Sequence, residues 1–220
     1  MTITLVFLAL LLAVVVWWLV KQSINVQPWV AGGSTEDVHG SVLVQPTLKL
    51  GLWVLLAVVT SLFALFISAY AMRMKLGDWN PLPEPGLLWL NTGVLILTSA
   101  VMEWTRAAAN RGQKDGVRTG LFAAGVLTVA FLAGQLVVWQ QLHASGYFLG
   151  ANPANDFFYV LTALHGLHLL GGLVAWGRTT AGVQRGVALG AARLSVGLCA
   201  LYWHYLLLVW LVLFALLLST

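Results

Sequence analysis

The sequence has few charged residues: 8% of its 220 residues are Asp, Glu, Lys or Arg, whereas soluble proteins carry about 25%. Hydrophobic residues make up 60% of the chain, and its mean hydropathy is +0.89. This composition excludes a soluble globular protein and is typical of an integral membrane protein. The 11 basic residues exceed the seven acidic ones by a net charge of +4. Because they are scattered over connecting segments, we expect membrane topology, and not nucleic-acid binding, to explain the excess.

Cysteine is almost absent. The single cysteine, Cys199, lies in an apolar stretch, so the sequence offers no intrachain disulfide, no CxxC pair and no thiolate cluster for a metal. Any redox chemistry would therefore have to come from histidine ligands or from a partner protein.

Long apolar stretches are abundant. Six of them meet the requirement of about 20 residues for crossing a bilayer as a helix. We therefore predict an all-α, polytopic membrane helix bundle with six transmembrane helices. Their predicted bounds are Ile3–Val20, Leu50–Ala71, Leu87–Trp104, Val117–Leu142, Phe157–Trp176 and Leu194–Leu218.

The first apolar stretch has the position of a signal peptide but not its charge pattern. No Lys or Arg precedes it, and Lys21 follows it, so we predict an uncleaved anchor helix. The segment of about residues 21–49 is rich in turn-forming residues and is predicted to be an irregular surface loop. The chain would then consist of an N-terminal anchor helix with a cytoplasmic loop at residues 1–48, and a five-helix core at residues 49–220.

The basic residues are unevenly divided between the two sides of the predicted bundle. Nine of the eleven follow the first, third and fifth apolar stretches. By the positive-inside rule, these connections face the cytoplasm of a bacterial-type plasma (inner) membrane. Both termini are then predicted on the outer, periplasmic side.

Three histidines lie within the apolar stretches, where an ionisable side chain is a functional candidate by default. His165 and His168 are three residues apart and are expected on one face of a helix, while His204 lies about as deep in the last helix. Three interpretations compete. The histidines could bind haem or copper, relay protons, or hydrogen-bond across helices as neutral imidazoles.

The number of further metal ligands and acidic residues in the sequence distinguishes between these interpretations. Haem or copper needs two or three suitably placed ligands, and the remaining histidines, His39 and His143, lie in predicted loops. A proton relay needs a chain of acids, and the apolar stretches contain only Glu103. We therefore favour interhelical hydrogen bonds. Close helix packing is also indicated by three small neighbours of these histidines, Gly166, Gly171 and Gly172.

The third apolar stretch carries polar residues of its own. Asn91 and Thr92 can form hydrogen bonds between helices. Glu103 and Arg106 are three residues apart, a spacing that allows an ion pair. We interpret this pair as a salt-bridged end of the helix, at the point where the helix leaves the membrane.

Four segments of the chain carry a resemblance to a known family. They are KLGLWVLLAVVTSLFALFISAY at residues 49–70, WLNTGVLILTSAVMEWTRAA at 89–108, FFYVLTALHGLHLLGG at 157–172 and LYWHYLLLVWLVLF at 201–214. In this order and with nearly the same spacing, they resemble the helix signatures of the cytochrome c oxidase subunit III family of haem-copper oxidases. The resemblance covers about residues 49–218.

The resemblance implies a non-catalytic membrane subunit of a terminal oxidase, an oxidoreductase complex of the aerobic respiratory chain. Such a subunit has no catalytic residues and binds no cofactor, because haem and copper belong to the catalytic partner, subunit I. It packs against subunit I and the other oxidase subunits, binds phospholipid, and supports the stability, oxygen access and proton uptake of the catalytic subunit. The candidates for structural, lipid or subunit contacts are Asn91, Glu103, Trp104, Arg106, His165, His168, Trp203, His204 and Trp210.

The sequence departs from the family pattern at three positions. Val59, Val138 and Leu207 stand where many members carry a carboxylate, so any function of those acids is in doubt here. The single predicted N-terminal helix also differs from the two or none of other members. A lipid cleft formed by two helices would be altered, or completed by a helix of a partner.

Other functions remain open from the sequence. The corresponding subunit of a quinol oxidase and the accessory subunit of a nitric oxide reductase share the resemblance, because the electron donor binds elsewhere. From other classes, a small membrane transporter would need polar or broken helices at the midplane. A haem-bearing membrane anchor would need two facing imidazoles.

Overall fold

The computed structural model describes residues 37–80, 82, 86–187 and 189–219. Within this range the chain forms five helices, and each contains an apolar span long enough to cross a membrane. The predicted all-α membrane bundle is therefore confirmed for five helices, whereas the predicted helix Ile3–Val20 lies outside the described residues. The helices are α2 (Asp37–Arg73), α3 (Leu87–Asn110), α4 (Lys114–Ala144), α5 (Pro153–Gln184) and α6 (Leu189–Leu218).

Helices α3 to α6 contain the apolar stretches that predict them and extend beyond most of their ends, because their terminal turns carry polar residues that hydropathy leaves out. Helix α2 differs most from its prediction. It begins at Asp37, inside the segment predicted as an irregular loop, although its apolar span starts only at Leu48. The predicted boundary between an N-terminal part at residues 1–48 and a five-helix core at residues 49–220 stays a prediction.

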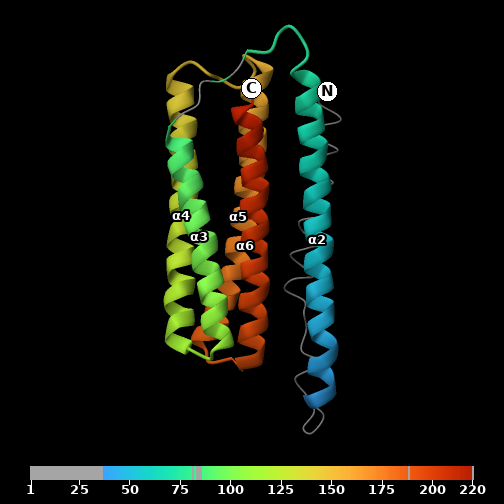
Figure 1. Ribbon diagram of the computed structural model, residues 1–220, viewed down its shortest axis with the longest axis vertical. Helices are drawn as coiled ribbons and strands as arrows, with labels where there is room; N and C mark the ends of the chain where they lie inside the picture. Colours follow the sequence, from blue (N-terminus) through green and yellow to red (C-terminus); the bar gives the residue numbers. More distant parts are fainter. Residues whose placement is uncertain (1–36, 81, 83–85, 188, 220) are drawn as a thin grey trace, which may run out of the picture. The chain divides into compact units, whose positions relative to one another are not determined.

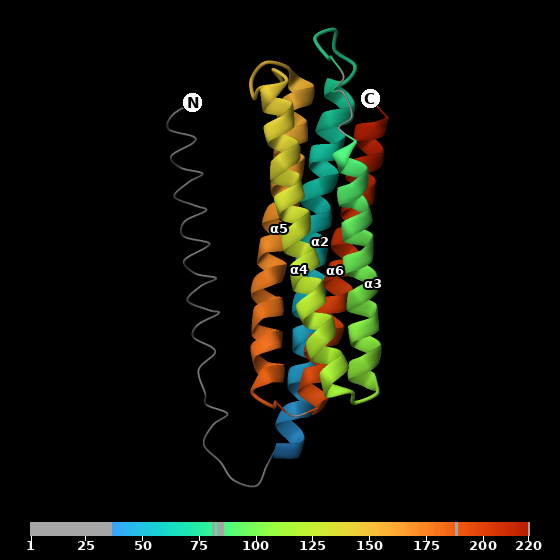
Figure 2. The same cartoon turned by 90° about the vertical axis from the view of Figure 1, so that its left-hand side faces the viewer.

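Contacts divide the chain into two units, Met1–Pro46 and Thr47–Thr220, and the second contains the bundle. In it, α3, α4, α5 and α6 lie side by side in both Figure 1 and Figure 2. Helix α3 packs against α4 and α6, and α5 packs against the same two helices. These four helices therefore close around a common core.

Local sequence explains how these helices begin and how they are joined. The side-chain oxygen of Asn152 accepts a hydrogen bond from the Ala154 amide (3.2 Å) and caps α5. Pro153 occupies the first helical position. A backbone N–H group there has no partner within the helix, so its absence in proline breaks no hydrogen bond. Gly112 and Gly186 have φ angles of 73° and 78°, which glycine adopts without strain. They close the short connections from α3 to α4 and from α5 to α6.

The connection from α2 to α3 is held by side chains. Arg73, the last residue of α2, donates hydrogen bonds to both carboxylate oxygens of Asp78 (2.8 and 2.5 Å). This hydrogen bonding lowers the pKa of Asp78 below its ordinary value of 3.8. Asn152 Nδ2 donates to the carbonyl of Asn80 (2.5 Å), so this connection is also fastened to the start of α5.

The core of the bundle is apolar but contains a repeated polar pair. Trp203 and Trp210 of α6 are fully buried, and their indole N–H groups donate to Thr128 Oγ1 (3.0 Å) and Thr92 Oγ1 (2.9 Å). Each threonine hydroxyl in turn donates to the carbonyl four residues earlier in its own helix. Lipid offers no water to a buried polar group, so these pairs satisfy indoles that would otherwise lack a partner.

From Leu48 onward, α2 joins the other helices through its larger side chains. Val59 and Phe63 are buried in an apolar cluster with Leu161 of α5. The Tyr205 hydroxyl of α6 donates to the backbone carbonyl of Leu56 (3.2 Å). Helix α2 is therefore attached by apolar contacts and by at least one hydrogen bond.

Candidate functional site

Polar residues of α3 and α6 form one connected network. His204 of α6 bonds to two residues of α3: its Nδ1 pairs with the Ser99 hydroxyl, and its Nε2 lies 3.2 Å from Glu103 Oε2. The Glu103 carboxylate also accepts hydrogen bonds from Arg106 Nε (2.9 Å) and Nη2 (2.6 Å). Ser99, Glu103, Arg106 and His204 together form the polar network.

The chemistry of these groups assigns the donors. A carboxylate only accepts, so His204 donates from Nε2 to Glu103, and in the neutral tautomer its Nδ1 accepts from the Ser99 hydroxyl. Arg106 follows Glu103 by three residues, which places the two side chains on one face of α3. The predicted ion pair of Glu103 and Arg106 is therefore confirmed, and His204 extends it to a second helix.

The polar network begins at the buried Ser99, and its three ionisable side chains lie on the outer face of the chain. The side chains of Glu103, Arg106 and His204 are 45%, 49% and 38% exposed. Leu208 and Leu211, which follow His204 at helical spacing, are also exposed. The surrounding face is thus apolar, and charge left uncovered in a bilayer costs free energy. The ion pair reduces this cost but leaves part of each charged group accessible.

The other two histidines within the membrane spans have different surroundings. His165 is fully buried, with its ring centroid 5.9 Å from that of Phe131 and 5.1 Å from that of Trp210. No described atom hydrogen-bonds to either of its ring nitrogens. His168 donates from Nδ1 to the Leu164 carbonyl of its own helix (2.7 Å). Within the described residues, the predicted hydrogen bond across helices is therefore present for the His204 ring; for the rings of His165 and His168 it stays a prediction.

His165 and His168 have separate surroundings, although they are only three residues apart on α5 and about 60° apart around its axis. His165 faces the core, while the His168 ring lies 5.5 Å from the Phe63 ring of α2. Among the neighbouring glycines, Gly172 gives the closest approach, because a Cβ added there would overlap the ring of Tyr202. The expected close packing is therefore present at this glycine.

Asn91 joins α3 to α4 inside the bundle. Its Nδ2 donates to the Phe131 carbonyl and to Gln135 Oε1, each at 3.3 Å. Gly134 provides the space, because a Cβ added there would overlap the Asn91 amide. By contrast, Trp104 is 47% exposed and follows Glu103 directly in the sequence. The predicted candidates thus divide between the core and the outer face.

Sequence reasoning missed three hydroxyl partners. Ser99 completes the polar network, and its only signal is that it precedes Glu103 by four residues on the same helical face. Thr128 and Thr162 accept the indole hydrogen bonds of Trp203 and Trp139. These pairs form between helices, so no spacing within the sequence could have matched the partners.

The three positions at which the resemblance implies a carboxylate have apolar surroundings here. Val59 and Val138 are 2% and 0% exposed, and Leu207 packs against the main core cluster. An acid in such surroundings would lose its solvation and would need a buried partner. These three positions therefore contribute packing.

The described residues contain no group of three or more His, Cys, Asp or Glu side chains that could hold a metal ion. Cys199 is buried, with its sulfur 3.4 Å from Thr179 Oγ1. The polar network itself offers one carboxylate, one guanidinium and one imidazole. This set is suited to ion pairing and hydrogen bonding with whatever covers it.

Comparison with known proteins agrees with the helices and motifs described above. A family model for cytochrome c oxidase subunit III matches residues 1–219. The chain is 30% identical over 157 residues to a probable cytochrome c oxidase subunit 3 of Nocardia farcinica, covering 70% of this chain and 76% of that protein. It is 31% identical over 195 residues to cytochrome c oxidase subunit 3 of Synechocystis sp., covering 84% and 79%. The chain therefore belongs to the cytochrome c oxidase subunit III family.

Proposed function

We propose that this chain is a non-catalytic membrane subunit of a haem-copper terminal oxidase in an aerobic respiratory chain. The observation that carries the proposal is the family match over residues 1–219, and the five membrane-length helices support it. Haem and copper are then held by the catalytic partner, subunit I, and this chain contributes no redox centre. Its role is to support the stability, oxygen access and proton uptake of that partner.

The polar network is the proposed contact with subunit I or another oxidase subunit. Glu103, Arg106 and His204 keep between a third and a half of their side-chain surface exposed. Hydrocarbon would leave that surface without hydrogen-bond partners, whereas polar side chains of another subunit would supply them. Trp104 lies on the same outer part of α3 and offers a large ring, a feature common at the centres of protein interfaces. These properties favour a protein partner over lipid tails.

A groove between α2, α5 and α6 is the proposed place for a phospholipid acyl chain. It has a volume of about 350 Å³, and its lining includes Leu52, Leu167 and Leu198. His168 and Tyr202 are among the lining residues that have polar side-chain atoms. Acyl chains and molecular oxygen are both apolar and both partition from water into such surroundings. The groove therefore supports the proposals of lipid binding and oxygen access.

We also propose that the connections after α3 and α5 face the cytoplasm of a bacterial-type plasma membrane. These connections and the adjoining turns are strongly basic, as the positive-inside rule requires. With the proposed N-terminal anchor helix at Ile3–Val20 and its cytoplasmic loop up to residue 48, both termini are then on the periplasmic side. The basic residues concerned are Arg111, Lys114, Arg118, Arg178, Arg185 and Arg193.

Copurification in mild detergent tests the proposed function. A tagged full-length chain is expected to retain a partner that shows a haem spectrum and contains copper. Glu103→Gln and His204→Leu are expected to lower the affinity for this partner roughly tenfold, because each leaves polar groups of the interface unpaired. The haem spectrum of the complex that remains should be unchanged, since neither residue is proposed to touch the cofactors.

Arg73→Gln provides a matched control. It breaks another exposed pair of arginine and carboxylate, with Asp78, and it lies outside the polar network. Retention of the partner should therefore stay near the wild-type level. A wild-type chain that retains no haem protein would refute the proposed function. Full retention by both network variants would refute only the assignment of the network to the contact.

A further inference from the structure

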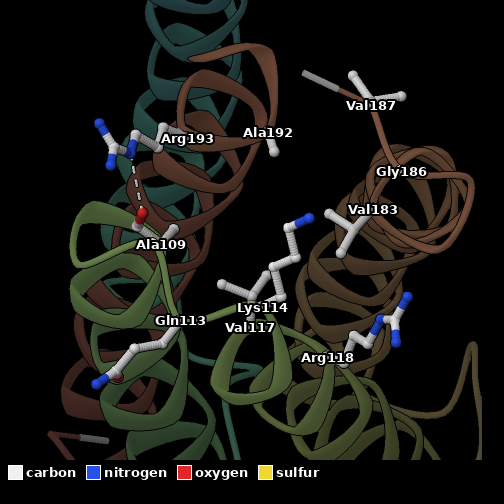
Figure 3. A pocket seen from close by; sticks show the side chains of 11 residues that line it. Ala109, Gln113, Lys114, Val117, Arg118, Val183, Gly186, Val187, Ala192 and Arg193 are labelled. Carbon is white, nitrogen blue, oxygen red and sulfur yellow. Dashed lines mark hydrogen bonds between the residues drawn. The ribbon is translucent and has the colours of Figure 1, made fainter. Parts of the chain in front are cut away.

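A second site lies at the end of the bundle where α3 joins α4 and α5 joins α6. It is a pocket of about 80 Å³, several times the roughly 10–15 Å³ that one water molecule requires by the same kind of measure. Its apolar walls are formed by Val117 of α4, Val183 of α5 and Ala192 of α6. Figure 3 shows these residues surrounding the opening. The space is large enough for a small polar group of several heavy atoms.

Three cationic side chains border this pocket: Lys114 and Arg118 of α4, and Arg193 of α6. In Figure 3 the Lys114 side chain extends between Ala192 and Val183, while Arg118 and Arg193 stand on opposite sides of it with their guanidinium groups directed outward. The described lining contains no Asp or Glu, and none of the described ion pairs includes these three cations. No described Asp or Glu therefore forms an ion pair with the cations that line the pocket.

One of the cations is held by the backbone. Arg193 Nε donates to the carbonyl of Ala109 near the end of α3 (3.0 Å). This bond fastens the first turns of α6 to α3 and leaves the two terminal amino groups of the guanidinium available to another acceptor. The arginine thus has a fixed position together with unused donors.

The helix ends add to the positive potential. Helix α4 begins at Lys114 and α6 begins at Leu189, so both present N-terminal turns to this end of the bundle. The first N–H groups of a helix lack partners within it, and the helix dipole favours negative charge there. Gln113, which precedes α4, makes no side-chain capping hydrogen bond. Asp115 of the same turn is exposed and is not part of the lining.

We propose that this pocket binds a phosphate group, carried by an anionic phospholipid headgroup or by a free phosphate compound. Phosphate combines negative charge with several acceptor oxygens, which suits a lysine as a point charge and arginines as fork-shaped donors. The apolar walls belong to membrane-spanning helices, so they would also receive the first carbons of a lipid. The site does not depend on an oxidase partner and therefore stands or falls separately from the proposed function.

Native mass spectrometry of the purified full-length chain, together with any chains that copurify, tests this proposal. The probes are phosphatidylglycerol and inorganic phosphate. We expect phosphatidylglycerol to bind, and the Lys114→Gln, Arg118→Gln double variant to lower its affinity about tenfold or more, because each cation near a phosphate contributes to the attraction. Ala192→Leu, which fills the pocket without changing its charge, should also weaken binding.

The control is the Arg111→Gln, Arg185→Gln double variant. It removes the same charge from residues outside the pocket lining and should change the affinity less than about twofold. Binding of phosphatidylglycerol that millimolar inorganic phosphate cannot displace assigns a lipid source. Binding and displacement by inorganic phosphate alone assign a free phosphate source. Equal affinities of the wild type and the pocket variant, or equal losses in the pocket variant and the control, overturn the proposal.

Discussion

His165 of α5 lies inside the bundle, and His204 of α6 lies on its outer face. The two histidines differ in their hydrogen-bond partners. His165 is enclosed by the rings of Phe131 and Trp210, and no described atom hydrogen-bonds to its nitrogens. His204 connects a hydroxyl and a carboxylate of α3. The buried imidazole thus contributes packing surface, whereas the exposed imidazole contributes hydrogen bonds to a charged network. We infer that the interior sets the stability of the chain, whereas the outer face sets what it binds.

Among the substitutions that test this difference between interior and outer face, the largest effect on stability is expected in the interior. Trp203→Ala removes a fully buried indole and its hydrogen bond to Thr128, and it leaves a cavity. The free energy of unfolding should fall by about 3–5 kcal/mol, measured by thermal or denaturant unfolding of the purified chain in detergent. Trp53→Ala is the control, because Trp53 is 59% exposed, and it should cost less than about 1 kcal/mol. Similar losses in both variants would contradict the assignment of stability to the interior.

A smaller effect is expected where α3 approaches α4. Gly134→Ala places a methyl group against the Asn91 amide and should lower the free energy of unfolding by about 1–3 kcal/mol. Gly93→Ala is the matched control, since nothing lies within 4 Å of the added carbon, and alanine favours a helix. Combining Gly134→Ala with Asn91→Ala should recover part of the loss. If the two changes are additive, the glycine is not needed for this contact.

The helices of this chain were predictable because bilayer thickness imposes a minimum apolar length on each crossing. The start of α2 was not, because the residues from Asp37 to Leu48 are too polar and too rich in turn formers to register as part of an apolar span. The charged terminal turns of α4 and α5 were left out of the predicted helices for the same reason. Hydropathy reports where a helix meets lipid and not where its hydrogen bonds begin and end.

Within the site, only the contacts between residues of the same helix could be predicted from the sequence. Glu103 and Arg106 share α3, so their spacing alone indicated the ion pair. The choice of Ser99 and Glu103 as partners of His204 depends on how α6 is rotated against α3, which a single helical pattern does not fix. The same limit applies to His165 and His168. Their spacing indicated a common face of one helix, but their surroundings are set by other helices.

The smallest effect is expected at His165. His165→Leu replaces a buried imidazole without a described partner by an apolar side chain of similar size. Burying an unpaired polar group costs free energy, so the free energy of unfolding should stay unchanged or rise by about 1 kcal/mol. His204→Leu removes two hydrogen bonds and should lower the same quantity by about 1 kcal/mol. The unfolding temperatures of the two variants, measured under identical conditions, should therefore not fall together. A clear loss of stability in His165→Leu would mean that the buried imidazole has a partner that stabilises the fold, and the division between a packing interior and a binding outer face would have to be abandoned.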